Sequence, residues 1–197
     1  AKLADKRLGF LFHLSENELK TDWMLHFCNT LMGAKQNNNG CGVKIIDFSE
    51  VPSDILPLIL GLITRIIFSV QQWSDINHRH PIALLCDEAH LYIPERKDGD
   101  IISTLSLNNF ERVAKEGRKY GVSLVVISQR PAEVNHTVLS QCNNFIALRL
   151  TNGEDQNIIK KLLPDNLGNI AENLSILDVG EAIVVGDASL LPSRIII

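Results

Sequence analysis

Short runs of Val, Ile, Leu and Ala alternate along the chain with longer segments in which apolar residues recur at helical spacing. The apolar runs cover residues 8–14, 43–48, 82–87, 122–128, 144–150, 181–187 and 193–197. Continuous runs of this length, separated by helices, are typical of strands in a parallel sheet that is covered on both faces. The pattern therefore predicts an α/β fold with a mainly parallel sheet flanked by helices.

Helices are predicted between these runs, at residues 15–34, 55–73, 107–120, 132–142 and 153–163. Ser15 is followed three residues later by Glu18, a capping-box signature for a helix start. Gly121 follows the third segment and favours a helix end there. The apolar stretch 55–70 contains Thr64 and Arg65 and is short for a bilayer span, so it is predicted to be a buried helix.

Composition narrows the class of protein. The chain has 197 residues, 45% hydrophobic and 21% charged, which is ordinary for one globular domain. The net charge of −4 gives no global signal for nucleic-acid binding, although local basic patches can still bind. The four cysteines show no CxxC spacing and are interpreted as reduced thiols. We expect a cytoplasmic protein with no membrane partner.

Two acidic residues end one of the apolar runs. The run leads directly into Asp87 and Glu88, and ligands of open parallel sheets sit at the carboxyl ends of the strands. An Asp at that edge can hold Mg²⁺ through its water shell. A Glu beside it can polarise the water that attacks a γ-phosphate. This is the Walker B arrangement, and the alternative is a strand end capped by two solvated acids.

The next apolar run ends in Ser128 and Gln129, a polar pair predicted to lie beside the Walker B strand. A Gln in that place can sense a γ-phosphate or orient water. Arg118 lies one turn before the preceding helix ends, where it can reach a neighbouring subunit as an arginine finger. The alternative, favoured for Lys115 and Lys119, is a solvated cation stabilised by the helix dipole.

Four segments resemble the C-terminal part of the HerA-type hexameric DNA translocases, which belong with the FtsK-like motors. They are ALLCDEAHLYIPE, ERVAKEGRKYGVSLVVISQRP, FIALRLTNGEDQN and LDVGEAIVVGDASLLPSRI. Two further segments, which also look like that family, extend the resemblance over nearly the whole chain: KIIDFSEVPSDI and DKRLGFLFHL. Its most specific part is DEAH followed by KEGRKYG and then SQRP. The resemblance implies a RecA-like P-loop ATPase core, a homohexameric ring and double-stranded DNA in its pore.

The resemblance also implies roles for individual residues. The implied catalytic set is Asp87, Glu88, Gln129 and Arg118. The implied nucleotide-binding set is Asp87, Ser128, Gln129 and Arg149, with Asp87 holding Mg²⁺ through water. Two roles stay open for Arg149: contact with ATP across a subunit interface, or an ion pair with Asp155.

The sequence departs from the family pattern in one respect, because it contains no G-x-x-x-x-G-K-[ST]. That loop supplies the N–H cradle and the Lys that hold phosphates. In the family it precedes the region matched here, and the chain begins with Ala1 rather than Met. We therefore expect the C-terminal portion of a longer protein, inactive by itself. The alternative is a degenerate ATPase that serves as a scaffold.

We expect a single RecA-like portion over residues 1–197. It divides into an entry region at about 1–40, a core with Walker B and sensor at 41–150, and a C-terminal helix with late strands at 151–197. The DEAH label also occurs in two-domain helicases, but SQRP stands where those have Ser-Ala-Thr, and a second domain does not fit in this length. His90 is therefore not expected to couple two domains.

Two segments are candidates for DNA contact. The loop 94–100 carries Arg96 and Lys97, and the segment after Pro131 carries His136. Contacts to phosphate would be independent of sequence and sensitive to salt. The alternative for the first loop is an exposed Arg–Lys pair, which is common in loops.

The prediction is a HerA-type DNA translocase or helicase subunit that hydrolyses ATP between subunits of a ring, together with a nuclease or anti-phage effector. One alternative is a ring that scaffolds an effector, with hydrolysis secondary. The other is a conjugation-type coupling ATPase that pumps DNA across a membrane, which would need a transmembrane anchor upstream.

Overall fold

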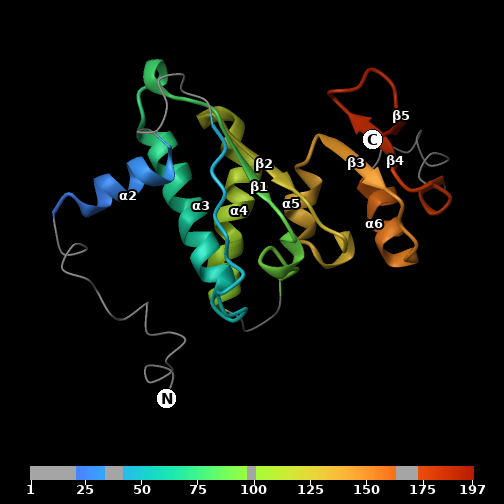
Figure 1. Ribbon diagram of the computed structural model, residues 1–197, viewed down its shortest axis with the longest axis horizontal. Helices are drawn as coiled ribbons and strands as arrows, with labels where there is room; N and C mark the ends of the chain where they lie inside the picture. The colour runs from blue at the N-terminus through green and yellow to red at the C-terminus, as the bar shows by residue number, and fades with distance from the viewer. Residues whose placement is uncertain (1–20, 34–41, 97–100, 163–172) are drawn as a thin grey trace.

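The computed structural model describes residues 21–33, 42–96, 101–162 and 173–197 (Figure 1). Its helices are α2 (Trp23–Leu31), α3 (Leu56–Trp73), α4 (Ile101–Tyr120), α5 (His136–Ser140) and α6 (Gly153–Leu162). Its strands are β1 (Ile82–Cys86), β2 (Val122–Val126), β3 (Asn144–Leu148), β4 (Glu181–Gly186) and β5 (Ser193–Ile196). Short 3-10 turns include η3 (Ile76–His78), η4 (Ala89–Leu91), η5 (Pro131–Glu133) and η7 (Asn173–Ser175).

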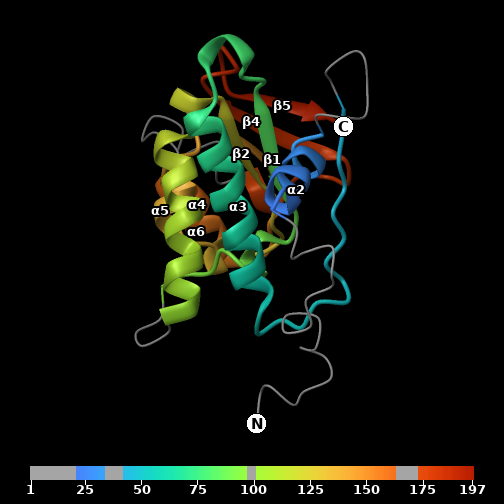
Figure 2. The ribbon, with the colours of Figure 1, turned by 90° about the vertical axis from the view of Figure 1, so that its left-hand side faces the viewer.

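The first sheet contains β1 and β2, which pair in parallel from Ile82 opposite Val122 to Cys86 opposite Val126. Helices α3 and α4 lie side by side over one face of this sheet (Figures 1 and 2). The predicted α/β architecture and parallel pairing are confirmed here. Among the described residues the opposite face is open, and Leu85 on it is 67% exposed.

The second sheet is antiparallel, in the order β3-β4-β5. It packs on α6 and η7 through an apolar cluster of Ile159, Leu174, Leu177, Ile183 and Val185. The predicted strands at 144–150, 181–187 and 193–197 are thus present, but they form a separate antiparallel sheet rather than an extension of the parallel one. Apolar run length does not distinguish the two, because pairing direction depends on how the chain returns to the sheet.

The predicted strand at residues 43–48 is wrong for the described structure. This segment forms no strand, and Val43 and Ile45 are 93% and 88% exposed. A strand requires a partner that satisfies its backbone donors and acceptors, and no described element pairs with this run. The predicted strand at 8–14 and the capping box at Ser15 lie outside the described residues.

Helix α3 packs closely on α4. The Ser106 hydroxyl donates to the Pro57 carbonyl oxygen, and Phe68 of α3 meets Val113 of α4 in a buried cluster. By length and composition alone α3 could cross a membrane, but Gly61, Thr64 and other residues along it are buried within the fold. Packing on α4 buries one side of α3, whereas Leu58 and Leu62 are 42% and 54% exposed, so the predicted buried helix is only partly buried among the described residues.

Gly61 permits the close approach of the two helices. A Cβ built at Gly61 would lie 2.7 Å from the Ser106 Cα, which is backbone and cannot move aside. We expect Gly61→Ala to force α3 and α4 apart and lower the free energy of unfolding by about 1–3 kcal/mol. Denaturant unfolding measures this. Gly153→Ala is the matched control, because a Cβ there meets nothing within 4 Å; equal stability of both variants would contradict the packing argument.

Candidate nucleotide-hydrolysis site

Two loops meet at the carboxyl ends of β1 and β2. The ladder continues one step beyond the strands, with the Ile127 N–H donating to the Cys86 carbonyl at 2.9 Å and the Ala89 N–H donating to the Ile127 carbonyl at 3.0 Å. These bonds hold the turn after β1 against the segment after β2. Residues distant in sequence are thereby brought together at the sheet edge where ligands bind in open parallel sheets.

The turn at Asp87 and Glu88 has an unusual backbone. Glu88 has φ 47°, in the left-handed region that non-glycine residues seldom adopt. Asp87 Oδ1 accepts the Glu88 N–H at 3.0 Å, and the Tyr92 hydroxyl donates to the Asp87 carbonyl at 2.8 Å. These contacts stabilise a conformation that costs free energy by itself, which is common where side chains are held for function.

The Glu88 carboxylate lies among polar groups of both loops. Its Oε1 accepts from the Gln129 amide at 2.7 Å, and its Oε2 lies 3.4 Å from His90 Nδ1. His90 Nδ1 is also 3.1 Å from the Ser128 hydroxyl. The structure therefore brings together Glu88, Gln129 and Ser128, three residues singled out from the sequence, and adds His90 to them.

Apolar packing against α4 supports the turn at Asp87 and Glu88. Tyr92 packs on Phe110 of α4, with ring centroids 6.0 Å apart. Burial is the main cause that raises the pKa of the Tyr92 hydroxyl far above its usual range, and burial raises the pKa of Cys86 to about 11. Both groups are therefore neutral near pH 7, and they serve the site by packing and by hydrogen bonding rather than as acids.

Helix α6 holds the segment that follows Gln129. Asp155 of α6 is buried, and its Oδ1 accepts the Ala132 N–H of η5 at 2.9 Å. The possible ion pair between Arg149 and Asp155 is not found in the described structure. Arg149 is instead exposed beside Asp178 and Glu181. The Asp155 carboxylate thus fixes the loop that carries Gln129.

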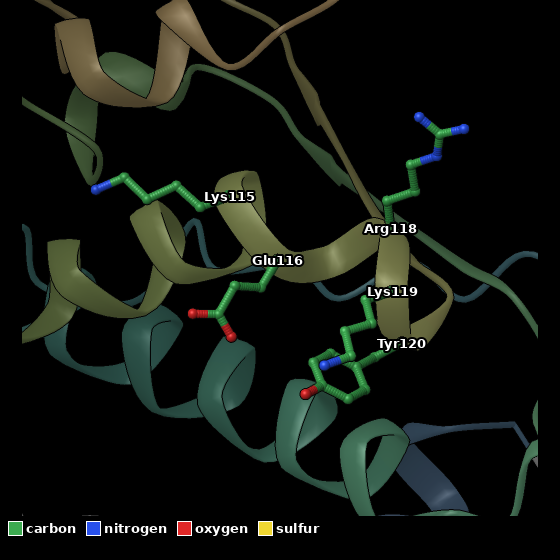
Figure 3. Close-up of a pocket in the computed structure, with 5 residues that line it drawn as sticks. All are labelled: Lys115, Glu116, Arg118, Lys119 and Tyr120. Carbon is green, nitrogen blue, oxygen red and sulfur yellow. The ribbon is translucent and has the colours of Figure 1, made fainter.

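Arg118 does not join this cluster. It lies near the end of α4, four residues before Val122, and β2 starts level with β1. Arg118 is therefore at the amino ends of the strands, roughly 15 Å along the sheet from Glu88. It is exposed, and Figure 3 shows its side chain pointing away from Lys119 and Tyr120, which lie on the α3 side of the helix.

The DNA-contact candidates occupy different settings. Arg96 pairs with Glu111 at 2.8 Å and with Asn108 at 2.9 Å, so its guanidinium is tied to α4 although half exposed. Burial alone would raise the pKa of Glu111, but hydrogen bonds from Arg96 and Lys115 hold it below its usual range. His136 is exposed at the start of α5. Lys97 lies outside the described residues.

The donor set suits magnesium held with a nucleotide. Within the described part of the chain, no three His, Cys, Asp or Glu side chains gather as a metal site. Asp87 is exposed at the sheet edge and offers one carboxylate. Mg²⁺ is commonly bound by one or two carboxylates, with water and phosphate oxygens completing its shell. Asp87 therefore meets the requirement for one carboxylate ligand of Mg²⁺.

Comparison with known proteins shows the family of the chain. The family described as "Helicase HerA-like C-terminal" matches residues 59–192. The chain is 32% identical over 156 residues to the DNA double-strand break repair helicase HerA of Sulfurisphaera tokodaii, covering 77% of this chain and 30% of that protein. It is 36% identical over 116 residues to the protein of that name from Pyrococcus furiosus, covering 59% and 20%. The chain thus spans less than a third of these relatives.

Solved structures agree on the fold. The genome packaging NTPase B204 of Sulfolobus turreted icosahedral virus 2, in complex with AMPPCP, matches with TM-score 0.55 and 11% identity, over 90% of this chain and 91% of that one. The DNA-packaging ATPase B204 of Sulfolobus turreted icosahedral virus matches with TM-score 0.54 and 13% identity, over 88% of each chain. At such identities the likeness concerns the fold alone, and it confirms the predicted α/β fold.

Sequence reasoning missed Tyr92, considered Asp155 only as a partner of Arg149, and left His90 without a role. Tyr92 lies only five residues after Asp87, so a search for hydroxyls near the acids could have found it. No local signal marks Asp155, because its partner Ala132 is 23 residues away in the chain.

We expect Asp155→Ala to lower the free energy of unfolding by about 1–3 kcal/mol, because the Ala132 N–H loses its acceptor in a half-buried setting. The Ala132 amide should also exchange its hydrogen faster. Asp155→Asn keeps an oxygen acceptor and should lose less. Glu154→Ala, at an exposed neighbouring position, is the control. Unchanged amide exchange in Asp155→Ala would refute the proposed support of this loop.

Proposed function

Because the chain belongs to the HerA-like C-terminal helicase family, we propose that it is part of an ATP-hydrolysing motor that moves double-stranded DNA through a homohexameric ring. One observation carries the proposal. Glu88, beside Asp87 at the carboxyl end of β1, is hydrogen-bonded at 2.7 Å to Gln129 at the end of the neighbouring strand. An acid–amide pair at this edge of the sheet supports a site for a γ-phosphate and its attacking water.

Each residue has a separate task in this proposal. Glu88 accepts the proton of the attacking water and so acts as general base. Gln129 orients the water and the Glu88 carboxylate, to which it already donates. Asp87 holds Mg²⁺ through water, and Ser128, next to Gln129 in the same loop, contacts the nucleotide. When bound, magnesium neutralises charge on the phosphates.

The position of Arg118 favours a site shared between subunits. Within one chain it lies at the opposite end of the strands from Glu88, too far away to act on the same nucleotide. In this proposal its exposed side chain acts on a nucleotide bound by another copy. A ring in which each subunit offers Glu88 on one side and Arg118 on the other meets this requirement. The arginine would then stabilise charge that develops in the transition state.

DNA handling is proposed from the relatives, which are named as DNA double-strand break repair helicases. Arg96, Lys97 and His136 remain our candidates for phosphate contact. Arg96 would have to act while paired with Glu111, which restricts its reach. Arg149 remains a candidate for ATP contact across the interface. A nuclease or anti-phage effector working with the ring is part of the same proposal.

Glu88→Gln is the direct test of the catalytic assignment. In the intact protein that carries this chain, we expect kcat for ATP hydrolysis to fall by about 10²- to 10⁴-fold, because an amide cannot accept the proton. Binding of a nucleotide analogue should persist. Glu154→Gln removes an exposed carboxylate of α6 and serves as control. Hydrolysis at the wild-type rate in Glu88→Gln would show that Glu88 is not the base.

Mixed rings test whether Arg118 acts in trans. Arg118→Ala and Glu88→Gln should each be inactive alone. Mixed together they should regain part of the ATPase activity, because some interfaces then pair an intact Glu88 with an intact Arg118. ATPase assays across a range of mixing ratios measure this recovery.

Lys119→Ala is the control for that experiment, because Lys119 lies beside Arg118 but on the other side of the helix end (Figure 3). It should stay active alone. Absence of any recovery in Arg118 and Glu88 mixtures, in rings shown to exchange subunits, would exclude an arginine acting between copies.

A further inference from the structure

The two oxygens of Glu88 have different partners. Oε1 accepts from the Gln129 amide at 2.7 Å. Oε2 is buried and has no hydrogen-bond partner within the described part of the chain. His90 Nδ1 lies 3.4 Å from Oε2. A buried carboxylate oxygen without a donor is unfavourable, so the imidazole beside it needs an explanation.

The His90 ring is held in place by its surroundings. Its side chain is only 12% exposed, and Nδ1 also lies 3.1 Å from the Ser128 hydroxyl oxygen. That oxygen already accepts the Arg130 N–H at 3.0 Å. The imidazole therefore sits between the turn after β1 and the loop after β2, with one nitrogen facing groups of both.

The proton on this nitrogen decides what His90 can do. If Nδ1 carries a hydrogen, it can donate to Ser128 and to Glu88 Oε2. If Nε2 carries the hydrogen, Nδ1 can only accept from the Ser128 hydroxyl, and Oε2 remains without a donor. Only the first arrangement offers the buried carboxylate oxygen a donor.

We propose that His90 is a positioning residue for Glu88, which it orients by donating from Nδ1 to Oε2 while resting on Ser128. This inference rests on the proposed ATPase function and deepens it. Both oxygens of Glu88 are then tied to the loop after β2, one through Gln129 and the other through His90 and Ser128. The direction of the carboxylate, and hence of the water it activates, follows the position of that loop.

Three substitutions separate the role of Nδ1 from simple packing. His90→Asn places an amide nitrogen as many bonds from Cα as Nδ1. His90→Gln places it one bond further, near the position of Nε2. His90→Leu removes both nitrogens and keeps apolar bulk. Each is made in the intact protein, and kcat and KM for ATP are measured together with thermal unfolding.

We expect His90→Leu to lower kcat by about 10- to 100-fold, because a misdirected base loses its alignment with the water. KM should stay within about twofold, because binding does not depend on Glu88 alignment. His90→Asn should recover most of kcat and His90→Gln little of it. If the Leu variant fails to fold, the comparison of Asn with Gln decides by itself.

Several outcomes would overturn the inference: unchanged kcat in His90→Leu, a rise in KM with kcat unchanged, or equal loss in the Asn and Gln variants. These outcomes differ from failure of the proposed function. If the wild-type protein hydrolyses no ATP with or without duplex DNA, the function itself is wrong and the inference falls with it. If the wild type is active and His90→Leu matches it, only the role of His90 is wrong.

Discussion

The parallel register of β1 and β2 is the constraint on which the candidate site depends. Ile82 starts level with Val122, and both strands are five residues long, so they end together. Two further backbone hydrogen bonds, from Ile127 to Cys86 and from Ala89 to Ile127, extend the ladder into the loops. A one-residue slip would turn every side chain to the other face and would separate Glu88 from Gln129.

The same register determines where Arg118 lies. Helix α4 returns to the amino ends of the strands, and Gly121 makes the connection with φ 72°, while the Ile82 N–H donates to its carbonyl. Gly117 is needed just before this point, because a Cβ there would lie 2.2 Å from the Val122 carbonyl oxygen. The end of α4 thus rests directly on the start of β2. This contact places the arginine at one end of the sheet and the acids at the other.

Two contacts from separate parts of the chain stabilise the loops that carry the polar groups of the candidate site. Tyr92 joins the turn at Asp87 to α4, and Asp155 joins the loop at Ala132 to α6 and the antiparallel sheet. The two supports hold the two loops independently. The Glu88 side chain reaches the second loop through the Gln129 amide, and the Asp87 carboxylate accepts the N–H of its left-handed backbone.

Several features followed from the sequence because they depend on neighbouring residues. The spacing of hydrophobic residues predicted most strands and helices, and Gly121 predicted the end of α4. The two acids directly after an apolar run indicated the position of the candidate site. Other features depended on residues far apart. The antiparallel pairing of β3 to β5, the exposed segment at 43–48, the Asp155 contact and the His90–Ser128 contact were decided by tertiary structure. An apolar run indicates only that a segment can be buried or can form a strand. Which strand it pairs with, and in which direction, depends on how the folded chain returns to it.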